Sequence, residues 1–220
     1  MAGPAVAADG AAPRTIAGLL GRHADTSPPV GTAGASVTIV LRQGRVEVEV
    51  LLIERTERTT DPASGQVALP GGHVEEVDSS LARTALRELD EEVGLAESDL
   101  AGPIRYVETK DAPRFRLAVA VFAAELGADS GPPSARSRDE VAHIFWLPRS
   151  ALAATRRVPR DTTLGWIDVS ATVYEGHVLW GFTRRVLRDF FALPAEDELV
   201  GLPFAPRRTT EGGAVPGAGS

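Results

Sequence analysis

The chain has 220 residues, of which 43% are hydrophobic and 24% are charged, and these proportions are ordinary for a globular protein. It has no cysteine, which excludes disulfides, thiolate nucleophiles and cysteine-based zinc sites. The formal net charge of -7 disfavours DNA binding, although a small basic pocket could still hold phosphates. No apolar run approaches the ~20 residues needed to cross a bilayer. We therefore expect a cytoplasmic protein that has no membrane or DNA partner.

The two ends of the chain differ in composition from its middle. Residues 1–33 mix Ala, Gly and Pro around one apolar patch, Ile16–Leu20, which predicts a short helix in an otherwise flexible segment. This start lacks the basic segment and continuous apolar core of a signal peptide. Residues 206–220 are rich in Arg, Thr, Gly and Pro, which predicts a disordered tail. One folded domain over residues 34–205 is therefore expected.

The folded part opens with two β-branched segments, Ala35–Leu41 and Val46–Glu54, which predict a strand pair joined by a turn at residues 42–45. The polar loop that follows, Arg55–Ser64, contains Arg55 and Arg58. These arginines are either solvent-exposed or available to bind a substrate, and the pattern alone leaves both interpretations open.

A short acidic helix follows this loop. Asp78 is a suitable N-cap for a helix over residues 79–93, and Gly94 is a suitable stop. One stripe of this helix is apolar and is expected to be buried, and it comprises Leu81, Ala85, Leu86, Leu89 and Val93.

Three glutamates of this helix, Glu88, Glu91 and Glu92, lie within one helical turn. Their charges repel one another, and two of them stand near the negative end of the helix dipole, where acidic residues are unfavourable. A divalent cation would relieve both effects, and carboxylate oxygens suit Mg²⁺, Mn²⁺ or Ca²⁺. The alternative is a solvated acidic face on which Arg87 pairs with Glu91.

Further strands are predicted after the helix, over residues 104–109 and 114–126. The second is nearly continuous in apolar residues, which is typical of a strand buried on both faces. Arg114 at its start either contacts a substrate phosphate or lies on the surface. Residues 156–160 are predicted to form a basic loop, and residues 163–169 and 172–174 two short strands. An amphipathic helix from Trp180 to about Leu193 closes the domain.

The segment Arg87–Leu95 resembles the REUxEExGU core of the Nudix box, with Gly72 and Asp78 resembling its leading glycine and first acidic residue. The aspartate, and the eight residues between it and Arg87, resemble the coenzyme A diphosphatase branch of that family. Two other segments, Gly65–Gly72 and Trp180–Leu187, are also similar to segments of this branch.

This resemblance implies an α/β fold, a Nudix-type α/β/α sandwich with a mixed β-sheet. It implies that Mg²⁺ or Mn²⁺ is held by Glu88, Glu91 and Glu92 with the Gly72 carbonyl. Glu140, which precedes the Trp146 strand, is a further candidate ligand or general base, with Asp139 as the fallback. Arg87 would orient the glutamates. The substrate-binding candidates are Arg55, Arg58, Gly65, Gln66 and Arg114.

The resemblance also implies a function. The expected enzyme is a diphosphatase that hydrolyses a nucleoside diphosphate derivative, with coenzyme A or acyl-coenzyme A as the leading substrate. Its partner would be a small-molecule nucleotide, and it could form a homodimer. Two alternatives stay open: another Nudix substrate, such as a nucleotide-sugar, an oxidised nucleotide or capped RNA, and a catalytically weak nucleotide sensor.

Overall fold

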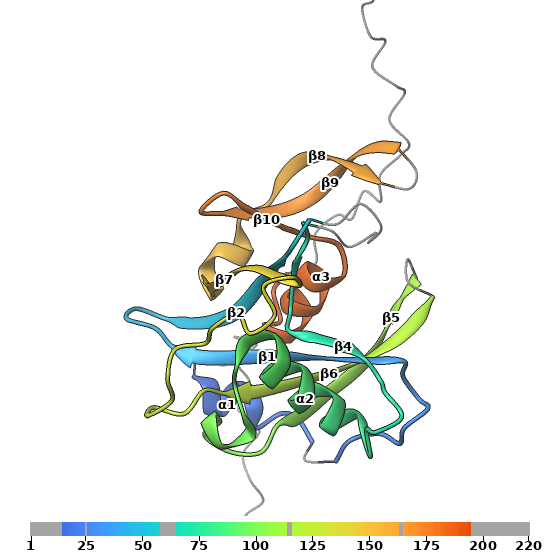
Figure 1. Ribbon diagram of the computed structural model, residues 1–220. Helices are drawn as coiled ribbons and strands as arrows, with labels where there is room; N and C mark the ends of the chain where they lie inside the picture. The colour runs from blue at the N-terminus through green and yellow to red at the C-terminus, as the bar shows by residue number, and fades with distance from the viewer. Residues whose placement is uncertain (1–14, 25, 58–64, 114–115, 163–164, 195–220) are drawn as a thin grey trace, which may run out of the picture.

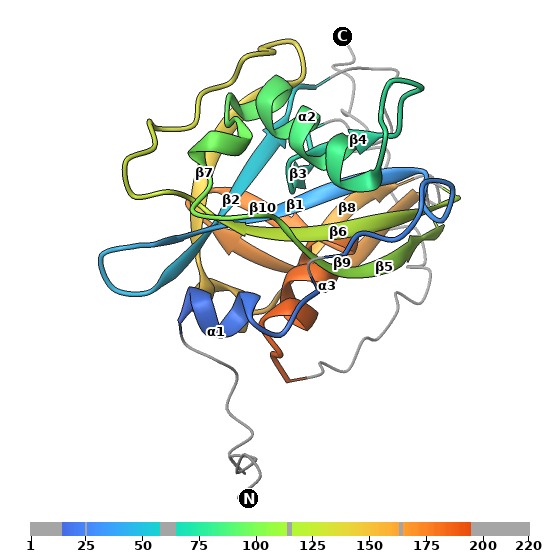
Figure 2. The same cartoon turned by 90° about the horizontal axis from the view of Figure 1, so that it is seen from below.

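The structure is a computed structural model that describes residues 15–24, 26–57, 65–113, 116–162 and 165–194. A mixed β-sheet lies between helix α2 (Leu81–Val93) on one face and helices α1 (Ile16–Leu20) and α3 (Gly181–Phe190) on the other, as Figure 2 shows. This arrangement confirms the predicted α/β/α sandwich. No helix in the described ranges is long and apolar enough to span a membrane.

The large sheet contains seven strands, with the order β3-β2-β1-β6-β5, and β4 and β7 pair with β1 and β2. Strands β1 and β6 are parallel, and the other pairs are antiparallel. The strands are β1 (Ala35–Gln43), β2 (Val48–Arg55), β3 (Val67–Ala68), β4 (Gly71–His73), β5 (Arg105–Ala112), β6 (Leu117–Glu125) and β7 (Val141–Pro148).

Alternation along the central strands produces one hydrophobic core on each face of the sheet. In β1, Ile39 and Leu41 pack toward α1 and α3, whereas Val40 packs toward α2. Successive side chains of a strand point to opposite faces, so a strand covered on both sides needs a continuous apolar run. Strand β6 also has a continuous run of buried residues, which confirms the prediction of a strand buried on both faces.

A second, antiparallel sheet lies above the first and is formed by β8 (Arg156–Thr162), β9 (Gly165–Tyr174) and β10 (His177–Trp180) (Figure 1). The basic loop predicted at residues 156–160 is wrong, because this segment is strand β8 and pairs with β9. Likewise, the two strands predicted between residues 163 and 174 form one longer strand. In both cases cross-strand pairing overrides the local composition.

Helix α2 begins three residues after Asp78, and its N-cap is Ser80, whose hydroxyl accepts a hydrogen bond from the Arg83 amide. The prediction of Asp78 as the N-cap is therefore wrong. At the other end, Gly94 has φ 69° and closes the helix as predicted. The Ser36 hydroxyl of β1 donates a buried hydrogen bond to the Leu81 carbonyl and thereby ties the start of the helix to the sheet.

Candidate metal centre and substrate pocket

The buried end of the acidic cluster is Glu92, whose side chain is 2% exposed. Its carboxylate accepts a 2.9 Å hydrogen bond from the Gly71 amide and lies 3.8 Å from the Arg55 guanidinium. Burial raises the pKa of Glu92 to about 8, and the charges of Glu88 and Glu140 act in the same direction. Additional positive charge beside Glu92 would therefore favour its ionised form near neutral pH.

The Gly71–Gly72 strand lies close to two of the glutamates. A Cβ atom at Gly71 would lie 2.2 Å from the Ser36 carbonyl oxygen, and Gly71 also has φ 153°, so no side chain fits there. A Cβ atom at Gly72 would lie 2.3 Å from a carboxylate oxygen of Glu88. The two glycines thus allow the backbone to contact both carboxylates directly. Burial also raises the pKa of Glu88.

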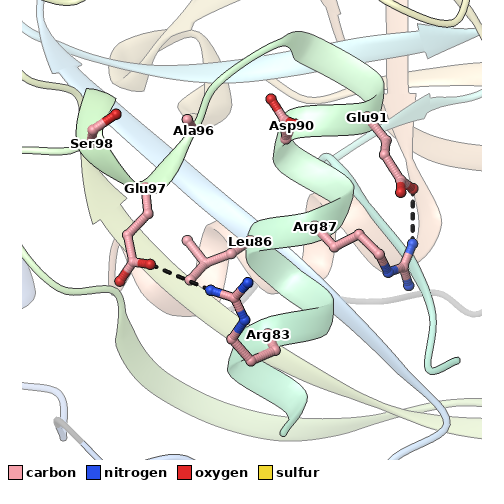
Figure 3. Close-up of a pocket in the computed structure, with 8 residues that line it drawn as sticks. All are labelled: Arg83, Leu86, Arg87, Asp90, Glu91, Ala96, Glu97 and Ser98. Carbon is pink, nitrogen blue, oxygen red and sulfur yellow. Dashed lines mark hydrogen bonds and ion pairs between the residues drawn. The ribbon is translucent and has the colours of Figure 1, made fainter. Parts of the chain in front are cut away.

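Arg87 is the centre of a hydrogen-bond network. Its guanidinium donates to Glu88 and Glu91, each at 2.9 Å, to the His73 carbonyl at 3.0 Å, and to both carboxylate oxygens of Asp78. Figure 3 shows Arg87 pointing toward Glu91, while Arg83 pairs with Glu97. Because the planar guanidinium has five donors, it can fix several carboxylates at once.

Asp78 supports Arg87 instead of capping the helix. Its side chain is 4% exposed and accepts further hydrogen bonds from the Glu75 amide and the Thr84 hydroxyl. The hydrogen bond from Arg87 is the main reason that the pKa of Asp78 falls to about 2. The sequence alone could not show this role, because Asp78 and Ser80 are both suitable N-cap residues and lie only two positions apart.

Glu140 stands at the start of β7 and its side chain is exposed. Its backbone carbonyl accepts a hydrogen bond from the Thr56 amide, which places it beside the end of β2. The charge of Glu140 contributes to raising the pKa of both Glu88 and Glu92. The fold therefore brings together the β7 carboxylate and the α2 carboxylates, which are distant in sequence.

Within the described residues, no three carboxylates or imidazoles converge on a single point as a preformed metal cage. Arg87 holds Glu88 and Glu91, whereas Gly71 and Arg55 hold Glu92. The donor set nevertheless fits a hard divalent cation, because buried like-charged oxygens beside the bare Gly72 backbone gain from added positive charge.

A pocket of about 660 Å³ adjoins this centre on the α3 face of the sheet. Its floor is apolar and includes Ala35, Val37, Leu117 and Val119 from β1 and β6. The walls of the pocket are formed by the segments before and within β3 and β4, by the end of β5 and by the start of α3. The polar and aromatic residues that line it are Arg55, Gln66, His73, Trp180, Phe182, Thr183 and Arg185.

Of the predicted substrate-binding residues, Arg55 and Gln66 line this pocket. Gly65 is described but is not among its lining residues. Arg58 and Arg114 lie outside the described residues. From the sequence, the start of α3 is part of an amphipathic helix, and its pattern gives Arg185 no particular role. The resemblance of Trp180–Leu187 to the coenzyme A branch marked this segment, but it did not distinguish Arg185 from its neighbours.

The sequence of this chain is similar to that of known proteins. The model of the NUDIX domain matches residues 32–165, which is more than half of the chain. The chain belongs to the Nudix hydrolase family. The Nudix hydrolase NudL of Shigella flexneri serotype 5b, described as uncharacterized, is 30% identical over 173 residues, covering 73% of this chain and 82% of the relative.

Two further proteins are similar to this Nudix hydrolase. The NudL protein of Cronobacter sakazakii, also described as uncharacterized, is 30% identical over 151 residues, or 63% of this chain and 72% of the relative. The crystal structure of a NUDIX hydrolase from Alicyclobacillus acidocaldarius superposes with a TM-score of 0.50 at 19% identity, covering 72% of this chain and 90% of that one. This likeness supports the fold.

Membership of the family assigns the reaction class. The chain is a Nudix pyrophosphohydrolase that acts on nucleoside diphosphate derivatives. Nudix hydrolases generally use divalent metals such as Mg²⁺ or Mn²⁺. Homodimer formation and a cytoplasmic location stay predictions from the sequence.

Proposed function

We propose that this Nudix hydrolase cleaves the diphosphate bond of coenzyme A or an acyl-coenzyme A. The products would be adenosine 3′,5′-bisphosphate and 4′-phosphopantetheine or its acyl derivative. One observation carries the proposal. The pocket is lined jointly by Gln66–Leu69 with Gly71 and Gly72, and by Trp180–Thr183. These residues belong to the two segments beyond the helical core of the Nudix box that resemble the coenzyme A branch.

The diphosphate would bind where the pocket meets the acidic centre, beside Gly72. Glu88, Glu91 and Glu92, together with the Gly72 carbonyl, would hold Mg²⁺ or Mn²⁺. Such an ion neutralises diphosphate charge and lowers the pKa of a bound water. The Glu91 side chain is 56% exposed, whereas those of Glu88 and Glu92 are largely buried. Glu91 would therefore hold the ion on the side that faces solvent.

The protein's own residues would position and deprotonate the attacking water. Glu140 is the proposed proton acceptor, since it is exposed to water and its charge acts on Glu88 and Glu92. Arg87 would orient Glu88 and Glu91 without contacting the substrate. Arg55 lines the pocket beside Glu92 and would bind a diphosphate oxygen.

The remainder of the pocket suits the rest of such a substrate. Its apolar floor and the Trp180 and Phe182 side chains provide surfaces for an adenine ring or for the pantetheine chain. A nucleoside triphosphate has no comparable second apolar arm. The pocket therefore favours a diphosphate that joins two bulky groups.

A substrate panel tests the proposal. The full chain would be incubated with coenzyme A, acetyl-coenzyme A, ADP-ribose, diadenosine polyphosphates and nucleoside triphosphates, each with Mg²⁺, with Mn²⁺ and with a chelator. We expect metal-dependent release of adenosine 3′,5′-bisphosphate from coenzyme A to have the highest kcat/KM. Faster hydrolysis of another compound would overturn the substrate assignment and leave the reaction class intact.

A further inference from the structure

Arg185 lies in the first half of α3 and lines the pocket. One of its terminal nitrogens, Nη2, donates to the Asp111 carbonyl, and its guanidinium lies 5.8 Å from the centre of the Phe182 ring. Its Nε atom is buried and has no hydrogen-bond partner among the described residues. A buried donor without a partner is unfavourable, so a bound group that accepts a hydrogen bond from it would be stabilised.

The two arginines that line the pocket, Arg185 and Arg55, differ in whether a carboxylate offsets their charge. Arg55 lies 3.8 Å from Glu92, which offsets its charge. Within the described part of the chain, Arg185 forms no ion pair, and its one hydrogen bond is to a neutral carbonyl. The start of α3 adds positive potential, because its N-cap residue, Trp180, provides no side-chain cap. This wall of the pocket therefore favours an anion.

We propose that Arg185 is a specificity-determining residue that binds a phosphate monoester on the nucleotide part of the substrate. The inference rests on the proposed function, because it takes the scissile diphosphate to bind beside Gly72. A substrate with only that diphosphate leaves the Arg185 charge without a partner. A substrate with an additional phosphate, such as the 3′-phosphate of coenzyme A, provides one and gains a charge-assisted hydrogen bond.

The test compares coenzyme A with 3′-dephospho-coenzyme A as substrates of the wild type and of Arg185→Ala. The wild type should have the higher kcat/KM for coenzyme A. The variant should lose roughly 10- to 100-fold on coenzyme A, as for one charge-assisted hydrogen bond, and should keep its kcat/KM for the dephosphorylated substrate. Arg185→Lys should keep part of the preference. Arg83→Ala removes an equal charge from the outer face of α2, is 58% exposed, and should change neither value.

The outcomes separate this inference from the proposed function. Turnover of the dephosphorylated substrate reports that Arg185→Ala is folded. Equal loss on both substrates, or a wild type without preference between them, would overturn the role of Arg185. If the wild type cleaved neither compound, the proposed function would fail, and calorimetric titration with adenosine 3′,5′-bisphosphate would decide the inference. Binding that weakens at least tenfold in Arg185→Ala would support the site, and absent or unchanged binding would refute it.

Discussion

The amide of Gly71 donates a 2.9 Å hydrogen bond to the buried carboxylate of Glu92, and this contact joins the β4 strand to the last turn of α2. Both sides of the contact are constrained. Gly71 cannot carry a side chain, and Glu92 is enclosed by the helix and the sheet. The position of the Gly72 carbonyl relative to the glutamates therefore depends on Glu92 as well as on the loop itself.

Glu92→Gln should abolish most activity without unfolding the protein. The glutamine oxygen can still accept from Gly71, while the charge is lost, so we expect turnover to fall roughly 10²- to 10⁴-fold. Because burial raises the pKa of Glu92 to about 8, the metal-free variant should be at least as stable as the wild type at pH 7. Initial rates and thermal denaturation would measure both effects. Glu97→Gln, at a 64% exposed position, is the control, and a loss below tenfold in Glu92→Gln would contradict the metal-site assignment.

Gly72→Ala tests the contact between the backbone and Glu88. The added methyl group would lie 2.3 Å from the carboxylate oxygen and must displace it. Displacing a ligand in this way typically weakens metal binding about 10- to 100-fold. Calorimetric titration with Mn²⁺ would measure the change. Gly102→Ala is the matched control, because the added methyl group there would meet no atom of the described residues within 4 Å apart from its chain neighbours. Equal affinities in the two variants would argue against this site.

Arg87→Lys should lower turnover by roughly 10- to 100-fold, as for loss of an outer ligand-orienting group. A single ammonium cannot replace a guanidinium that contacts Asp78, Glu88, Glu91 and the His73 carbonyl together. Arg83→Lys on the same helix should retain normal rates, since Arg83 pairs only with exposed Glu97 among the described residues. Steady-state kinetics would measure both variants. A slow Arg87→Lys would show that the hydrogen-bond network is needed, whereas a normal rate would show that a positive charge at this position is sufficient.

Asp78 gives a pH-dependent prediction. Its pKa of about 2 in the folded protein lies below its ordinary value of 3.8, so its contribution to stability is complete above about pH 5 and disappears as the pH falls toward 2. We expect Asp78→Asn to lose about 1–2 kcal/mol near neutral pH, after allowance for solvent screening, and nearly nothing at pH 2. Urea denaturation across this range would measure the difference.

The true N-cap provides the control for that experiment. Ser80→Ala should lose about 1 kcal/mol, and this loss should not vary over the same pH range, because serine does not titrate there. If Asp78→Asn abolished activity without changing stability, Asp78 would belong to the catalytic centre instead of supporting Arg87.

Glu140→Gln tests the identity of the proton acceptor. If Glu140 accepts the proton, its loss should lower kcat about 10²- to 10⁴-fold and leave the melting temperature unchanged, because the side chain is exposed. Asp139→Asn should retain a kcat near that of the wild type. The reverse ranking of the two variants would assign the base to Asp139, and full activity in both would assign it to a helix glutamate.

The local features of this protein could be predicted from its amino-acid sequence. The apolar stripe of α2, the spacing of Glu88, Glu91 and Glu92, and the Gly94 stop follow from helical periodicity, which operates within a few residues. The contacts between separate elements could be seen only in the tertiary structure. Asp78 pairs with Arg87 because the segment after β4 folds back on the helix. Arg185 and Gln66 line one pocket because α3 packs against the sheet. Such contacts depend on how separate elements pack, and no periodicity within one segment encodes that packing.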